Sequence, residues 1–164
     1  VHALRKGTIA GAGLDVTEAN WDAVFDTNVK GQFFMAQAVA RPMIARGWGR
    51  IIFLSSQSGL VAIAGQPAYC SSKAAVILLA KTLAVEWAKH GVTVNAVAQT
   101  FVETGLTRAR LANPEFRKSV VDRIPAGRLA QPDDVAAAVV YLASPEAGMV
   151  TGTVLSVDGG WTAV

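Results

Sequence analysis

Four polar side chains have types and spacings that could move a proton to or from a small molecule. Tyr69 and Lys73 are four residues apart in a segment with helical periodicity, so they share one face of the predicted helix. A lysine one turn from a phenol stabilises the phenolate and lowers the tyrosine pKa from about 10, as proton exchange with an alcohol or carbonyl requires. Ser56 ends an apolar run thirteen residues earlier, where its hydroxyl could bond the same substrate oxygen. Asn28 is the fourth residue and lies inside an otherwise apolar helical segment.

A purely structural interpretation of these residues is also open. A tyrosine and a lysine four residues apart occur by chance on many helices. The pair gains weight because the polar run Ser56–Gly59 precedes it and because Asn28 interrupts an apolar pattern. Together the residues predict one catalytic site formed by Asn28, Ser56, Tyr69 and Lys73.

The elements that must position these residues alternate between helix and strand. Thr17 is a predicted N-cap, and the helix that it begins runs to about Arg46. Beyond it, the pattern predicts a buried strand over Arg50–Ser56, a helix over Tyr69–Lys89 and a strand over Val92–Ala98. Such alternation is typical of the α/β class.

The last third of the chain continues this alternation after a less regular stretch. Residues 99–131 are predicted to hold one short helix, from Pro114 to about Arg123, and connections of this length are often functional. A helix over Pro132–Ser144 and a strand from Thr153 follow. The order implies parallel strands joined by right-handed crossovers and flanked by helices.

Length and composition limit the classes of protein that remain. A chain of 164 residues suits a single domain, and 52% hydrophobic with 16% charged residues excludes a disordered chain. The longest uncharged apolar stretches, Ala74–Ala80 and Val135–Ala143, fall short of the ~20 residues that cross a bilayer, so no membrane partner is expected. The net charge of +3 is scattered, which argues against a nucleic-acid partner.

Cysteine and histidine usage adds two further expectations. Cys70 is the single cysteine, which excludes an intrachain disulfide and suits a cytoplasmic location. His2 and His90 are far apart and lack the spacing of metal ligands, so no metal site is expected.

Several longer segments together resemble the short-chain dehydrogenase/reductase family. The resemblance covers roughly residues 14–164. It includes the apolar run that ends at Ser56 and the Ser-Gln-Ser-Gly segment that begins there. The segments that carry it are, in chain order, DTNVKG, IIFLSSQSG, YCSSK, VNAVA, FVET, GRLAQPDDVAAAVVYLAS and VTGTVLSVDGG. It implies a doubly wound Rossmann fold and hydride transfer between NAD or NADP and a small-molecule alcohol or carbonyl substrate.

The resemblance also implies a role for each matched residue. Tyr69 would be the acid/base, Lys73 would lower its pKa and hold the nicotinamide ribose, Ser56 would orient the substrate oxygen, and Asn28 would anchor a water in the proton relay. In the family pattern, the backbone at Val102 and the hydroxyl of Thr104 contact the nicotinamide side of the cofactor.

Two departures from the family pattern accompany this resemblance. Gln99 and Thr100 stand where the family usually has Pro-Gly, which alters the loop beside the nicotinamide. The N-terminal units that bind the adenosine half of the cofactor have no counterpart in this sequence, so a partial Rossmann fold is expected. The glycines of residues 7–13 are spaced as in a phosphate-binding loop, but the helix cap at Thr17 comes too late, so residues 1–13 are predicted to be a flexible loop.

Two hypotheses follow. In the first, the chain is the catalytic part of an NAD(P)-dependent oxidoreductase acting on a small polar alcohol. In the second, it is an inactive member that serves only as an oligomerisation or interaction module. Either way a homo-oligomer is expected. The resemblance implies a dimer through helices 17–46 and 69–89 and a tetramer contact at the last strand. It also implies an apolar sheet edge at residues 50–56, which a partner would cover.

Overall fold

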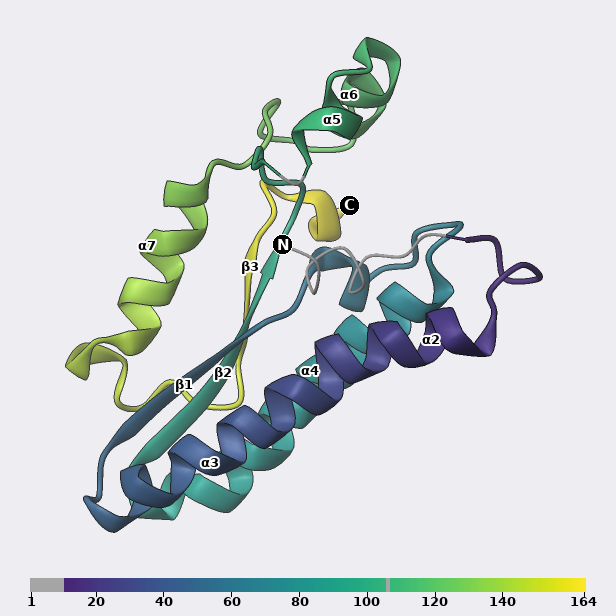
Figure 1. The fold of residues 1–164 in the computed structure, drawn as a ribbon. Coiled ribbons are helices and arrows are strands. Elements are labelled where there is room, and N and C mark those ends of the chain that lie inside the picture. Colours follow the sequence, from purple (N-terminus) through teal and green to yellow (C-terminus); the bar gives the residue numbers. More distant parts are fainter. Residues whose placement is uncertain (1–10, 106) are drawn as a thin grey trace.

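A three-stranded parallel sheet forms the centre of the molecule (Figure 1). This computed structural model describes residues 11–105 and 107–164. The strands are β1 (Gly49–Leu54), β2 (Val92–Gln99) and β3 (Val154–Val157), in the order β1-β2-β3. The register sets Ile51 opposite Val94 and Ala96 opposite Val154. The predicted α/β class with parallel strands is confirmed, and in the described residues β1 has a neighbour on one side only.

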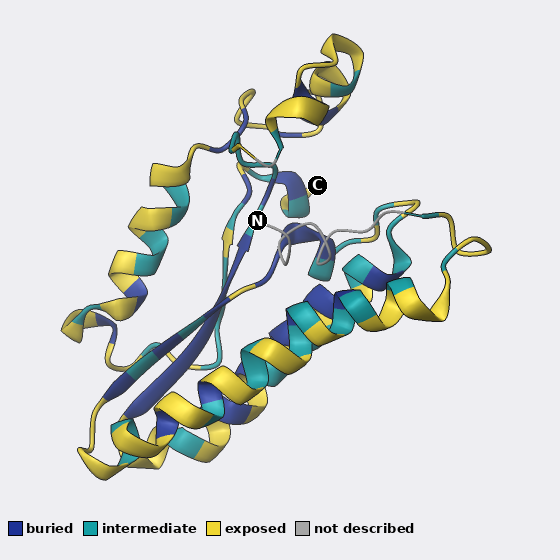
Figure 2. Ribbon diagram, in the orientation of Figure 1, coloured by how far each residue is buried: buried dark blue, intermediate teal, exposed yellow. Residues whose placement is uncertain are grey.

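Helices cover both faces of this sheet (Figure 1). They are α3 (Gly31–Ala45) and α4 (Pro67–Trp87) on one face and α7 (Pro132–Ala143) on the other. The main core forms where Ala36, Val76 and Ala80 of the first two helices meet Phe53 and Val94 of the sheet. Figure 2 shows the consequence, since the strands are buried while the outer surfaces of the helices are exposed.

The first predicted helix contains an interruption that its periodicity did not reveal. Thr17 caps it as predicted, because the Thr17 Oγ1 atom accepts a hydrogen bond from the Asn20 amide at 3.2 Å. The helix α2 (Glu18–Phe25) then passes into a π-helical turn at Asp26–Lys30 before α3 begins. A π turn holds more residues than an α turn and is frequent at functional sites. Asn28 lies buried within it.

Helix α4 carries two of the predicted site residues and is the longest helix in the described residues. With the 3₁₀ turn that follows, Pro67–His90 is the one helix in the described residues that is long and apolar enough to cross a bilayer. The expectation from uncharged stretches missed this, because the helix reaches that length only with charged residues such as Lys73 and Lys81 included. Its buried side chains pack on the sheet, as those of a core helix do.

A small helical lobe lies at the carboxyl ends of the strands (Figure 1). It consists of the predicted helix, α6 (Pro114–Val121), and a four-residue helix that was not predicted, α5 (Arg108–Leu111). Leu111, Val120 and Leu129 bury their side chains with Trp161 from the C-terminal turn in a second apolar cluster. The lobe is therefore anchored to the end of the chain beyond β3.

Residues 1–10 lie outside the described residues, so most of the predicted N-terminal loop is not addressed by the structure. Gly11, Ala12 and Gly13 are in non-helical backbone, and the Gly11 amide donates to the Gly65 carbonyl at 3.0 Å. The first helix of the described residues, α2, begins five residues after Gly13, so Gly11 and Gly13 do not open it.

Candidate active site

A cleft of about 570 Å³ opens at the carboxyl ends of β1 and β2. Ser56 and Tyr69 line one wall, and Val102, Thr104 and Phe116 line the other. Ligands of open α/β sheets bind at this edge, outside the carboxyl ends of the strands. Ser56, Tyr69, Val102 and Thr104, four of the six predicted site residues, thus share one cavity.

Ser56 is held by the turn that follows β1. Its backbone is extended, and its Oγ atom accepts a hydrogen bond from the Ser58 amide at 3.2 Å, which caps a 3₁₀ turn at Gln57–Gly59. The turn lies against α4, because a Cβ atom at Gly59 would stand 2.7 Å from the carbonyl carbon of Lys73. Glycine at this position therefore lets the Ser56 turn approach the helix that carries Tyr69 and Lys73.

Two more hydrogen bonds join the end of β1 to α4. The buried Ser55 hydroxyl donates to the Lys73 carbonyl at 2.8 Å, and the Lys73 ammonium donates to the Leu54 carbonyl at 2.9 Å. Ser55 was not singled out from the sequence, although it adjoins Ser56. Its hydroxyl and the Lys73 side chain fix the strand and the helix to each other.

The Lys73 ammonium lies over the ring of Tyr69. The ammonium is 5.6 Å from the centroid of the Tyr69 ring, and the residue is 9% exposed. Burial disfavours the charged form and lowers the pKa of Lys73 to about 8. The lysine is therefore close enough to act on the phenol but is itself weakly charged at mildly alkaline pH.

Tyr69 departs from the expectation for its acidity. Burial raises the pKa of Tyr69, and a negative charge at Cys70 would raise it further, whereas hydrogen bonding with the Ser56 side chain lowers it. The net shift is opposite in direction to the expected lowering, because desolvation outweighs the hydrogen bond with Ser56. Tyr69 therefore holds its proton at neutral pH.

Asn28 reaches the site through a second serine. Its Nδ2 atom donates to the Ser72 Oγ atom at 3.0 Å, and the Ser72 hydroxyl donates to the Tyr69 carbonyl at 2.8 Å. The π turn thereby contacts α4 one turn below the phenol. The structure thus places all four predicted catalytic residues around the first turns of α4.

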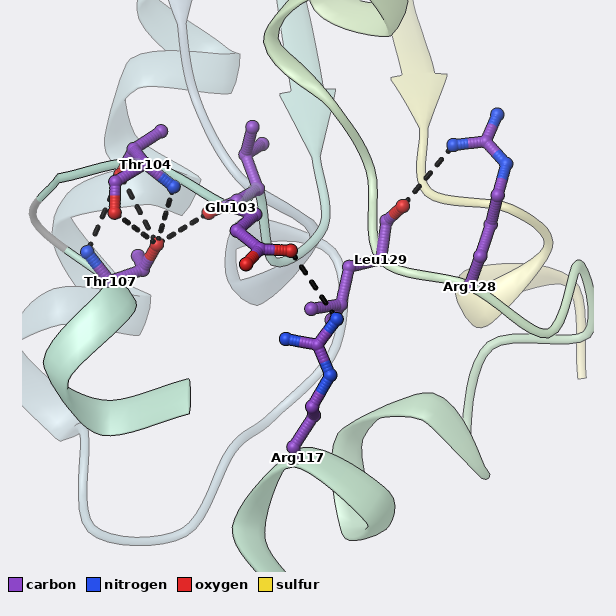
Figure 3. Close-up of polar contacts among 7 residues, drawn as sticks. Glu103, Thr104, Thr107, Arg117, Arg128 and Leu129 are labelled. Atoms are coloured by element: carbon purple, nitrogen blue, oxygen red, sulfur yellow. Dashed lines mark hydrogen bonds and ion pairs between the residues drawn. The ribbon is translucent and has the colours of Figure 1, made fainter. Parts of the chain in front are cut away.

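The opposite wall is braced by a threonine pair (Figure 3). The Thr107 hydroxyl donates to the Val102 carbonyl at 2.6 Å and accepts from the Thr104 amide at 2.9 Å, and the Thr104 and Thr107 hydroxyls are 3.2 Å apart. Val102 also pairs with Ala130 in a parallel bridge. These bonds tie Val102, Thr104 and Thr107 together next to the cleft, and Thr107 is a bracing residue that the sequence motifs did not reveal.

Three buried oxygens on the cleft lining have no hydrogen-bond partner in the described residues. They are Oε1 of Gln57, Oε1 of Gln99 and Oγ1 of Thr100. Buried polar atoms are nearly always paired, so an unpartnered oxygen on a residue that lines the cleft could accept a hydrogen bond from a bound molecule or a water. Gln99 and Thr100 are the pair that departs from Pro-Gly, and they line the cleft together with Val102.

The comparisons with known proteins agree with this arrangement. The family model described as Enoyl-(Acyl carrier protein) reductase matches residues 2–162. The chain belongs to the short-chain dehydrogenase/reductase family. It is 40% identical over 148 residues to the NAD-dependent glycerol dehydrogenase of Listeria innocua, covering 90% of this chain and 58% of that protein. It is 44% identical over 151 residues to a galactitol 2-dehydrogenase (L-tagatose-forming) of Cereibacter sphaeroides, covering 91% and 59%.

Solved structures of this family superpose closely on the chain. A gluconate 5-dehydrogenase of Burkholderia cenocepacia, in complex with NADP and tartrate, matches with a TM-score of 0.93 and 36% identity, covering 96% of this chain and 62% of that one. The Rossmann-type architecture is therefore confirmed. The chain spans less than two thirds of the length of these short-chain dehydrogenases/reductases.

Proposed function

We propose that this chain carries the catalytic centre of an NAD(P)-dependent oxidoreductase that interconverts an alcohol and a carbonyl compound. The observation that supports this most directly is that Ser56 and Tyr69 line one cleft at the carboxyl ends of the strands, with the Lys73 ammonium 5.6 Å from the centroid of the Tyr69 ring. The relatives named for glycerol, galactitol and gluconate extend the proposal to small polar alcohols and their oxidised forms.

In this proposal, NAD or NADP supplies the acceptor or donor of hydride. Tyr69 transfers the proton at the substrate oxygen, and its raised pKa keeps the proton in place for the carbonyl-reducing direction. Ser56 bonds the same oxygen as charge develops on it. Lys73, over the ring, stabilises the phenolate that is left, and Asn28 holds α4 through Ser72. Val102, Thr104, Gln99 and Thr100 would face the nicotinamide, and Lys73 its ribose.

The test combines cofactor binding with one substitution. The purified chain is titrated with NADH and NADPH, nicotinamide fluorescence is followed, and turnover of glycerol, galactitol and gluconate is then assayed with the preferred cofactor. Tyr69→Phe should bind cofactor like the wild type and lose about 10²–10⁴-fold in turnover, because it removes the transferable proton alone. Unchanged turnover in Tyr69→Phe would contradict the assigned role.

A second candidate function is an interaction module without catalysis. It is favoured by the apolar residues exposed on α3 and α4, among them Phe34, Met35, Leu78 and Val85. A chain that binds neither NADH nor NADPH but still associates with itself would support this candidate. Saturable micromolar binding of either cofactor supports the oxidoreductase.

A further inference from the structure

One wall of the cleft carries an isolated positive charge. Among the described residues that line the cavity, Arg110 of α5 is the one charged side chain, and no carboxylate lines it. The acidic residue nearest in sequence, Glu103, is engaged elsewhere, since it pairs with Arg117 at 3.3 Å (Figure 3). In the described part of the chain, Arg110 itself has no ion-pair partner.

The position of this guanidinium is set by its surroundings. It lies 4.2 Å from the centroid of the Phe116 ring, and Phe116 packs edge-on against Phe101, 5.9 Å between centroids. Both rings line the cleft. The helix that carries Arg110 begins directly after Thr107, which is bonded to the cleft wall. A guanidinium stacked on an aromatic platform loses less freedom when it binds a carboxylate.

A second polar group points to the same ligand from the catalytic wall. Gln57 follows Ser56, is 2% exposed, lines the cleft and leaves its Oε1 atom without a partner in the described residues. An unpaired acceptor on the residue that follows Ser56 suits a second hydroxyl of a substrate that binds at Ser56.

Resting on the proposed function, we infer that the cleft selects a hydroxylated carboxylate, a hydroxy acid or its oxo form, over a neutral polyol. Ser56 and Tyr69 would take the reacting oxygen, Gln57 an adjacent hydroxyl, and Arg110 the carboxylate. Arg110 is then a specificity-determining residue, because a guanidinium binds a carboxylate by charge-assisted, two-point hydrogen bonds. The phosphate of the cofactor is the other anion that could meet this charge, and the test below separates the two.

The test uses two probes that differ at one end of a six-carbon chain. The ¹⁵N-labelled chain is titrated with D-gluconate and with D-sorbitol, and amide shifts of the cleft residues are followed. Gluconate should bind about tenfold more tightly than sorbitol at low salt, and the preference should shrink as ionic strength rises. Arg110→Gln should abolish the preference and leave sorbitol binding unchanged. Arg108→Gln, on the same short helix but off the cleft, should keep it.

Three outcomes would overturn the inference: equal binding of the two probes by the wild type, no cleft shifts with gluconate, or a preserved preference in Arg110→Gln. A parallel titration with nicotinamide mononucleotide tests the other anion. If Arg110→Gln weakens the binding of the mononucleotide alone, Arg110 is assigned to the cofactor phosphate. The readout needs no turnover. If the chain binds NADPH but does not prefer gluconate over sorbitol, this inference fails and the proposed function stands. If it prefers gluconate over sorbitol but binds no cofactor, only the proposed hydride transfer fails.

Discussion

The pKa values of Tyr69 and Lys73 shift in opposite directions, and one cause explains both. Burial raises the pKa of the phenol and lowers that of the ammonium to about 8, because each group is less stable when charged in a poorly solvated site. The neutral pair is therefore favoured over a wider pH range than in water. A ligand that brings hydrogen-bonding groups into the cleft would restore part of the lost solvation.

The Lys73 shift predicts a pH dependence of stability. The unfolded chain binds the lysine proton up to the ordinary pKa near 10.5, whereas the folded chain releases it near pH 8. Between these values the unfolded state holds more protons, so the contribution of Lys73 to the free energy of unfolding rises with pH. Urea denaturation from pH 7 to 10 should show wild-type stability increasing relative to Lys73→Met across this window.

Lys81 provides the matched control for that experiment. It lies on the same helix but is exposed, so Lys81→Met should follow the wild-type pH profile. A wild-type profile parallel to that of Lys73→Met would show that the lysine is not desolvated as described.

How far the sequence predicted the site depends on the kind of interaction. The residues that carry chemistry, such as Tyr69 and Lys73, were recognisable by type and spacing. Their acidity was not, because it depends on burial that only packing determines. Arg110 stands in no motif, and Gln57 was noted only as part of the Ser56–Gly59 run, so both were given a role only once the structure showed them lining a shared cleft.

At the level of elements, the contact between the Ser56 turn and α4 is what assembles the catalytic group. Gly59 allows this contact, because a Cβ atom there would meet backbone atoms of Lys73 at 2.7 and 2.8 Å. Backbone cannot move aside as a long side chain can, so the added methyl must push the turn away from the helix.

Gly59→Ala should therefore destabilise the fold by about 1–3 kcal/mol and reduce turnover more than the loss of folded protein explains. Chemical denaturation measures the first effect, and turnover per folded molecule measures the second. Gly13→Ala is the control, because nothing lies within 4 Å of a Cβ atom at that position. If Gly59→Ala matched Gly13→Ala in both measurements, the close contact would not be what positions Ser56.

Elements were predicted well where local patterns decide them. The cap at Thr17, the left-handed Gly91 after α4 (φ 76°) and the prolines that open α6 and α7 all act within one turn of the chain. The π turn at Asp26–Lys30 escaped prediction, because its periodicity differs from that of an α-helix by a single residue. The helix α5 is too short to show a periodicity at all.

At the scale of the whole molecule, the exposed apolar surface of α3 and α4 supports the proposed self-association. Val85 is 82% exposed and Leu78 is 65% exposed on α4, and Phe34 is 55% exposed on α3. A core helix of a protein that stays monomeric would not be expected to place such side chains in water.

Val85→Lys should therefore convert the oligomer to a species of lower mass, because an interfacial lysine must be desolvated without a partner. Sedimentation velocity over a range of concentrations measures this. Val140→Lys, at a 68% exposed site on α7, should keep the association through α3 and α4. A monomeric wild type, or a Val85→Lys variant with wild-type mass, would exclude this surface as the interface.

The one-sided pairing of β1 divides its amide protons into two alternating sets. The Gly49 and Ser55 amides donate to the carbonyls of Gly91 and Val97, and strand geometry turns the amides of Ile51 and Phe53 the same way. The amides between them point away from β2. Deuterium from the solvent would thus exchange quickly at the β1 amides that point away from β2, while the amides that bond β2 remain protonated. A strand added beside β1 on the side opposite β2 would slow the exchange of the first set alone.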